Sequence, residues 1–66
     1  MKYRTEEQWN SICENIINGN WFDAGEEAAE YGFYAANMVD FYKYSNNGID
    51  ITDLIYLAEI AQEYRS

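Results

Sequence analysis

Apolar residues recur along the chain with the period of an α-helix, in three blocks that are separated by two short polar turns. In the first block the apolar positions follow the spacing i, i+3, i+4, i+7 and i+8, and they are Trp9, Ile12, Cys13, Ile16 and Ile17. Thr5 is the expected N-cap of this block, because Gln8 follows it at the spacing of a capping box. The pattern therefore predicts an amphipathic helix over about 5–18. Residues 1–4 form a short lead, in which Tyr3 is a candidate edge residue.

The second block runs from Trp21 to Tyr44, after an Asn-Gly-Asn turn in which Gly19 suits a left-handed position. On a helical wheel one of its faces is made of mostly small residues, namely Trp21, Ala24, Gly25, Ala28, Gly32, Ala35, Ala36 and Val39. The pattern predicts one long central helix over 21–44 whose small face admits close neighbours. Glycine in a helix costs about 1 kcal/mol relative to alanine. A kink or break near Gly32 is therefore the main alternative.

The third block follows an Asn-Asn-Gly turn, and Asp50 is placed to cap it with Asp53 in the first turn. A helix is predicted over 51–64. Its apolar positions cover more than half of the circumference, and they are Ile51, Leu54, Ile55, Leu57, Ala58, Ile60, Ala61 and Tyr64. This arc is wider than one bundle neighbour needs. The helix is expected either to be clasped between the other two or to be shared with a second copy, and clasping is favoured.

These elements define an all-α fold, a compact three-helix bundle with a long central helix, in a single domain over residues 1–66. The chain contains no proline, and 48% of its residues are hydrophobic, which indicates a folded protein and not a disordered acidic tail. A chain of 66 residues is close to the lower limit for a self-sufficient core. A homodimer or a tight partner would supplement such a core.

The formal net charge of −8 is unevenly distributed. The basic residues are Lys2, Arg4, Lys43 and Arg65, and three of the four lie near the chain ends. Residues 5–42 contain eight carboxylates and no Lys or Arg. Such a chain repels nucleic acid and anionic membranes and attracts basic protein surfaces. Direct binding to nucleic acid or to a membrane is therefore not expected.

The outer face of the predicted central helix is the main functional clue. It carries Asp23, Glu26, Glu27 and Glu30, and it continues through Tyr34, Asn37 and Phe41. Glu59 and Glu63 of the last helix are expected to flank it, or else Glu7 and Glu14 of the first. Aromatic anchors beside a charged patch are typical of a protein-binding surface, so these residues are the predicted partner-binding site. The alternative is a solvated face that only keeps the protein soluble.

Candidate catalytic, cofactor and metal sites are not found in the sequence. The chain has no histidine, and Cys13 lies on an apolar stripe, where it is expected to be a small buried side chain and not a nucleophile. The segment YSNNGIDITDLIYLAEI has the outline of a calcium loop, but Lys43 and Leu54 would occupy the first and twelfth ligand positions. A single cysteine, no apolar leader and no apolar run of about 20 residues predict a cytoplasmic protein.

The segment ICENIINGNWFDAGEEAAEYG resembles small acidic helical proteins of phages and mobile elements. The resemblance implies an anti-restriction or anti-CRISPR inhibitor that acts in the host cytoplasm on a nuclease complex or another nucleic-acid-binding protein. Carboxylates three or four residues apart on a helix lie about 5–6 Å from each other, which is similar to the spacing of phosphates along DNA. The leading hypothesis is thus a DNA mimic. The alternatives are an adaptor that binds through Tyr34, Phe41 and Tyr56, and a structural homodimer.

Overall fold

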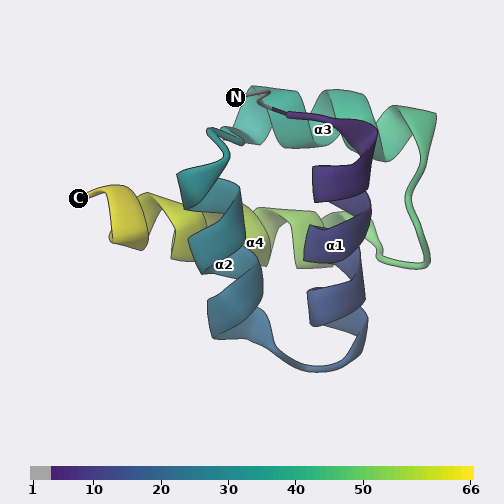
Figure 1. The fold of residues 1–66 in the computed structure, drawn as a ribbon. Helices are drawn as coiled ribbons and strands as arrows, with labels where there is room; N and C mark the ends of the chain where they lie inside the picture. The colour runs from purple at the N-terminus through teal and green to yellow at the C-terminus, as the bar shows by residue number, and fades with distance from the viewer. Residues whose placement is uncertain (1–3) are drawn as a thin grey trace.

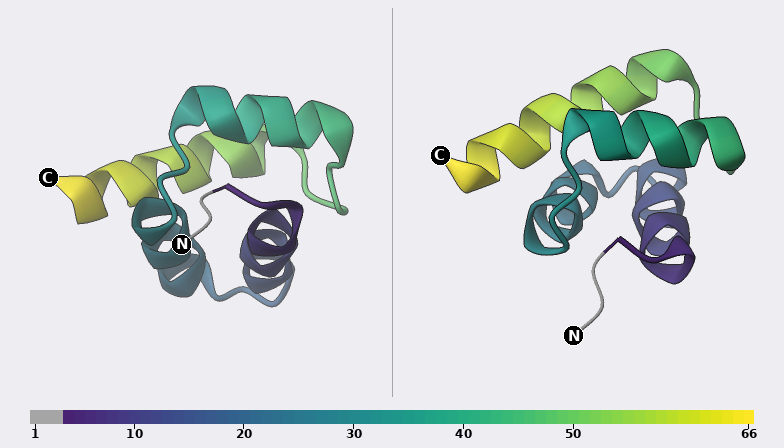
Figure 2. Two further views of the ribbon diagram at one scale, coloured as in Figure 1. Left: turned by 45° about the horizontal axis from the view of Figure 1, so that its top comes forward. Right: turned by 90° about the horizontal axis from the view of Figure 1, so that it is seen from above.

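The computed structural model describes residues 4–66, so the predicted edge residue Tyr3 lies outside the described residues. The regular structure of this part of the chain is helical: α1 (Glu6–Ile17), α2 (Trp21–Glu30), α3 (Ala35–Tyr44) and α4 (Ile51–Arg65) (Figure 1). The pair α1–α2 forms one antiparallel layer, and the antiparallel pair α3–α4 packs crosswise on it (Figure 2). The all-α class is confirmed, whereas the prediction of three helices is wrong.

The predicted long helix over 21–44 is divided by a turn at Gly32. Gly32 has a φ of +75° and donates its N–H to the carbonyl of Ala29 at 3.3 Å, while the N–H of Phe33 bonds Ala28 at 2.8 Å. These two bonds form the Schellman pattern that ends a helix. Tyr34 then begins α3 in an extended conformation, and its N–H is accepted by the side chain of Asn37. The alternative of a break near Gly32 is the correct one.

The other helix ends follow the sequence prediction. Thr5 and Gln8 form the expected capping box of α1, and Gly19, with a φ of +79°, occupies the left-handed position after that helix. Asp50 caps α4 and accepts the N–H of Asp53, whose carboxylate in turn accepts the N–H of Asp50. Local capping therefore sets three of the boundaries as the sequence indicated.

Trp9 lies at the centre of the core, where the two layers meet. Its ring contacts Phe33 and Phe41 at centroid distances of 5.8 and 5.9 Å, and its indole N–H donates to the carbonyl of Ser45 at 2.9 Å. The fully buried side chains include Trp9, Ile12, Cys13, Ala24, Ala28, Phe33, Met38, Leu57 and Ala61. The predicted apolar stripe of α1 is thus confirmed except at Ile17, which is 61% exposed because it is the last residue of the helix.

Helices α2 and α4 approach each other closely at Gly25. A Cβ atom at this position would lie 2.1 Å from Cγ2 of Ile60, so the contact requires glycine. α4 packs mainly on α2 and α3, and both of these belong to the predicted helix over 21–44. The expected clasping of α4 between that helix and the first one is therefore not observed, and Ile51 and Ile55 stay 51% and 55% exposed. Among the described residues, no helix is long and apolar enough to cross a membrane.

Replacing Gly32 by alanine provides a test of the turn between α2 and α3. We expect Gly32→Ala to lower the free energy of unfolding by about 1–2 kcal/mol, because an L-residue with a Cβ is strained in the left-handed region. Gly32→Asn should cost less, since asparagine tolerates this region better. Urea denaturation followed by circular dichroism measures both. If the helix were continuous, Gly32→Ala would instead raise the free energy of unfolding by about 1 kcal/mol.

Candidate functional site

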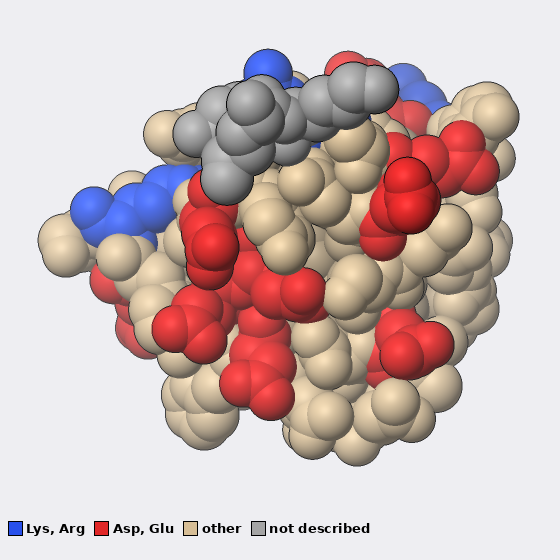
Figure 3. Space-filling view, in the orientation of Figure 1, with Lys and Arg blue, Asp and Glu red and all other residues tan. Residues whose placement is uncertain are grey.

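The carboxylates of α2 project from the side of the helix that is opposite to its packed face. Ala24, Gly25 and Ala28 are buried against the core, whereas the acidic residues Asp23, Glu26 and Glu30 are exposed. We call these three residues the acidic face. Figure 3 shows carboxylates gathered over α2 and over α1, with basic groups visible only at the margin of this view. The predicted acidic surface is therefore present on α2.

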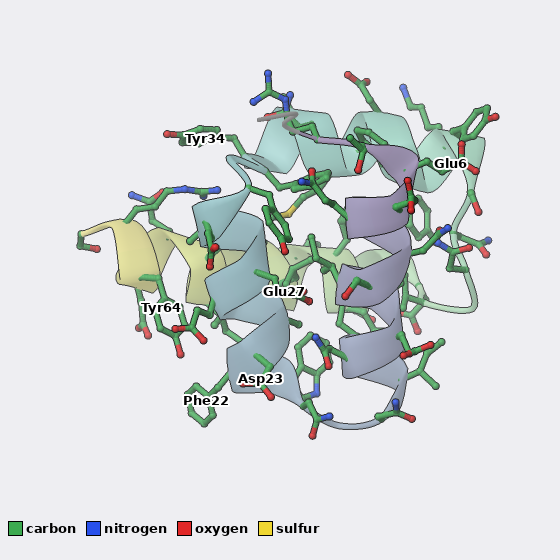
Figure 4. All side chains as sticks on the ribbon, viewed as in Figure 1. Glu6, Phe22, Asp23, Glu27, Tyr34 and Tyr64 are labelled. Carbon is green, nitrogen blue, oxygen red and sulfur yellow. The ribbon has the colours of Figure 1, made fainter. Side chains whose placement is uncertain are left out.

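Glu27 differs from the other acids of α2 because it is half-buried and already has partners. Its carboxylate accepts a hydrogen bond from the Ser11 hydroxyl at 3.0 Å and another from the Asn15 side-chain amide at 2.7 Å. Both donors belong to α1, so Glu27 joins the two helices of the first layer (Figure 4). This residue, predicted to bind a partner, thus has a structural role that the sequence did not reveal.

The aromatic continuation of the acidic face is not formed as one surface, because the chain turns after Glu30. Tyr34, Asn37 and Phe41 lie at the start of α3 or within it, and α3 runs across α2 (Figure 1). Tyr34 is 56% exposed, but Asn37 caps α3 with its side chain. Phe41 is half-buried, and its ring lies 5.2 Å from that of Phe33.

Two arginines hold the turn between α2 and α3. Arg4 donates to the carbonyl of Gly32 at 3.2 Å, and Arg65 donates to the carbonyls of Ala28 and Phe33. The Arg65 guanidinium also lies 4.0 Å from the centre of the Tyr34 ring, which is a cation–π contact. Cations at the C-terminal end of a helix interact favourably with its dipole, and α2 has no basic residue in its own last turn. This use of the arginines was not predicted from the sequence.

Glu59 and Glu63 border a cleft between α2 and α4. The cleft has a volume of about 470 Å³ and is lined by Gly19, Trp21, Phe22, Tyr56, Glu59, Ile60 and Glu63. The rings of Trp21 and Tyr56 meet edge-to-face at a centroid distance of 4.8 Å, and Phe22 is 75% exposed. We call this feature the aromatic cleft. Phe22 was overlooked, although a phenylalanine outside the small face of α2 was visible in the sequence.

A second hollow lies between α3 and α4 and is almost entirely apolar. It has a volume of about 600 Å³ and is lined by Ala35, Val39, Ile51, Leu54, Ile55, Ala58, Glu59 and Gln62. We call it the apolar groove. The half-exposed Ile51 and Ile55 belong to it, and Glu59 contributes the one ionisable group among its lining residues. The groove corresponds to the excess apolar arc that the sequence places on the last helix.

The single cysteine of the chain is held away from solvent. Cys13 is fully buried, and this burial raises the pKa of its thiol to about 11, against a smaller opposing effect of a hydrogen bond from the Asn47 side chain. The prediction of a small buried side chain is confirmed by this burial. A thiol with a raised pKa is mostly protonated near neutral pH and is a poor nucleophile. Among residues 4–66, no group of three or more acidic or cysteine side chains could hold a metal ion.

Comparisons of this chain with protein-family models, with curated proteins and with solved structures gave no match.

The two central acids of α2 should respond in opposite ways when they are neutralised. We expect Glu26→Gln to raise the free energy of unfolding by a few tenths of a kcal/mol, because it removes the repulsion from Glu30 one turn away. Glu27→Gln should lower it by about 0.5–1 kcal/mol, because it weakens the hydrogen bonds from Ser11 and Asn15. Parallel urea titrations of the two variants measure both effects. Equal shifts of the same sign would contradict the distinct role of Glu27.

Proposed function

We propose that this protein is a non-enzymatic inhibitor that binds the basic, nucleic-acid-binding surface of a host protein, as anti-restriction and anti-CRISPR proteins do. The observation that supports this proposal is the acidic face, on which Asp23, Glu26 and Glu30 are exposed along one side of a single helix. Arg4 and Arg65 are held by the turn that follows this helix. The negative charge of the face is therefore available to an external cationic partner.

The spacing on the acidic face supports the comparison with a nucleic-acid strand. Glu26 and Glu30 are one helical turn apart, and Asp23 precedes Glu26 by three residues, so the Cβ atoms of neighbouring acids are separated by about 5–6 Å. Lysine and arginine side chains that contact successive phosphates have a similar periodicity. In this proposal the carboxylates replace phosphates and compete for the same cationic groups.

Mutual repulsion within the acidic face also favours binding to a cationic surface. Like charges at positions i and i+4 destabilise an isolated helix by a few tenths of a kcal/mol. A partner that places a cation between Glu26 and Glu30 relieves this repulsion. The relief adds a favourable contribution to the free energy of binding. The partner would associate quickly and would dissociate as the salt concentration rises.

The test is a pull-down from bacterial lysate with stepwise salt elution, followed by a competition assay. The expected target is a nuclease or another nucleic-acid-binding protein that is released at moderate salt and is displaced from its DNA or RNA by this protein. Glu26→Gln combined with Glu30→Gln should weaken inhibition roughly tenfold, since charged interface contacts are often worth a kcal/mol or more.

Asp40→Asn is the matched control, because Asp40 is an exposed carboxylate on α3 and not on the acidic face. It should leave inhibition nearly unchanged. Three results would contradict the mimicry: undiminished inhibition by the Gln variant, an equal loss for Asp40→Asn, or a captured partner that still binds its nucleic acid.

A structural homodimer is the second candidate, and it is favoured by the apolar groove. A second copy of a chain with a net charge of −8 is repelled least where the contact surface carries few charges, and Glu59 is the one ionisable group that lines this groove.

The adaptor alternative depends on Tyr34 and Tyr56, which are 56% and 51% exposed, since Phe41 packs inward.

Sedimentation at high micromolar concentration distinguishes the homodimer from the inhibitor. If the groove joins two copies, the protein sediments as a dimer and Ile55→Asp returns it to a monomer, because the charge enters the apolar contact. Ile17→Asp is the control, since Ile17 is similarly exposed but is not among the residues that line the groove. A monomer at all concentrations removes the homodimer.

A further inference from the structure

The aromatic cleft combines aromatic rings with carboxylates. Trp21 and Phe22 come from the first turn of α2, while Tyr56, Glu59 and Glu63 come from one side of α4. We infer that this cleft binds an arginine side chain of the basic partner protein. The inference deepens the proposed function and rests on it.

The aromatic side chains supply the surface on which a planar cation stacks. Phe22 is 75% exposed, and in Figure 4 it projects from α2 into solvent on the same side of the molecule as Tyr64. Trp21 is half-buried and is supported from the side by the edge-to-face contact with Tyr56. The indole of Trp21 and the exposed ring of Phe22 are suited to bind a side chain that has an apolar stem and a cationic end, as arginine has.

The carboxylates supply the complementary charge. Glu59 and Glu63 are both exposed and lie one helical turn apart on α4, at the border of the same cleft. Because they form a like-charge pair at i and i+4, a cation held between them is attracted by both. Glu63 and Phe22 also line a smaller adjoining hollow, together with Ile60 and Tyr64, so the aromatic and acidic surface extends beyond the cleft.

Arginine fits this arrangement better than lysine does. Its guanidinium is planar, stacks on aromatic rings and donates several N–H groups in a fixed fork to carboxylates, whereas the lysine ammonium is compact and strongly hydrated. The cleft has a volume of about 470 Å³, which is ample for one such side chain. Asp23 follows Phe22 directly, so one basic partner can contact the acidic face and the cleft together (Figure 4).

The experiment is an NMR titration of the ¹⁵N-labelled protein with two peptides of equal charge, acetyl-GRGRGRG-amide and acetyl-GKGKGKG-amide. The two tryptophans report on separate places, because the Trp9 indole N–H is bonded to Ser45 in the core while Trp21 lines the cleft. The arginine peptide is expected to shift the Trp21 indole signal and to leave that of Trp9 in place. The lysine peptide should bind at least threefold more weakly by the same signal.

Phe22→Ala is the test variant, and its high exposure allows the fold to survive the change. It should lower the affinity for the arginine peptide roughly two- to fivefold, which corresponds to the loss of a cation–π contact at a partly exposed site. Tyr44→Ala is the matched control, because Tyr44 is 72% exposed on α3 and is not among the residues that line the cleft. It should leave the affinity unchanged.

The outcomes separate this inference from the proposed function. If the backbone signals of Glu26 and Glu30 shift while Trp21 stays silent, the cleft is not the arginine site, although the acidic face still binds cations. If neither the Trp21 signal nor the signals of Glu26 and Glu30 shift, both the arginine site in the cleft and the binding of cations by the acidic face are contradicted. Equal weakening by Phe22→Ala and Tyr44→Ala, or equal binding of the two peptides at Trp21, would also overturn the inference.

Discussion

The burial of Phe33 against Trp9 is the contact on which the arrangement of the four helices depends. Phe33 is fully buried and its ring lies 5.8 Å from that of Trp9, which is 24 residues earlier in the chain. A continuous helix over 21–44 would leave no turn at this point. Gly32 instead adopts a left-handed conformation, and the chain changes direction so that Phe33 enters the core. The crosswise packing of α3 on the first layer follows from this turn (Figure 2).

The same turn binds two of the four basic residues of the protein. Arg4 and Arg65 come from opposite ends of the described chain, and both donate to backbone carbonyls in the last turn of α2 or just after it. Arg65 also stacks on Tyr34. These contacts add to the backbone hydrogen bonds of the turn and place positive charge at the C-terminal end of α2. In a chain with four basic residues and twelve acidic ones, this leaves the exposed carboxylates of α2 without a basic neighbour on their own helix.

Local signals in the sequence were sufficient for the caps, for the stripe of α1 and for the exposed carboxylates of α2. They were insufficient at the two glycines of the predicted central helix, which have opposite roles. Gly25 lies within α2 at a point where Ile60 leaves no room for a Cβ, whereas Gly32 ends the helix. The two glycines can be distinguished only from distant contacts. Gly25 lies against Ile60, whereas Phe33, which follows Gly32, packs against Trp9. For the same reason, the sequence did not reveal the structural bonds of Glu27 or the aromatic cleft, which joins α2 to α4.

The acidic face and the aromatic cleft differ in the energy that each can contribute to binding. Exposed carboxylates attract a partner from a distance and raise its association rate, but salt screens them and each contact is weak. An aromatic wall excludes water around a bound cation, so it mainly slows dissociation and is less sensitive to salt. Since both surfaces include the first turn of α2, through Asp23 and Phe22, a single basic segment can use the two effects together. The salt dependence of a complete complex should then be shallower than the charge of −8 alone would suggest.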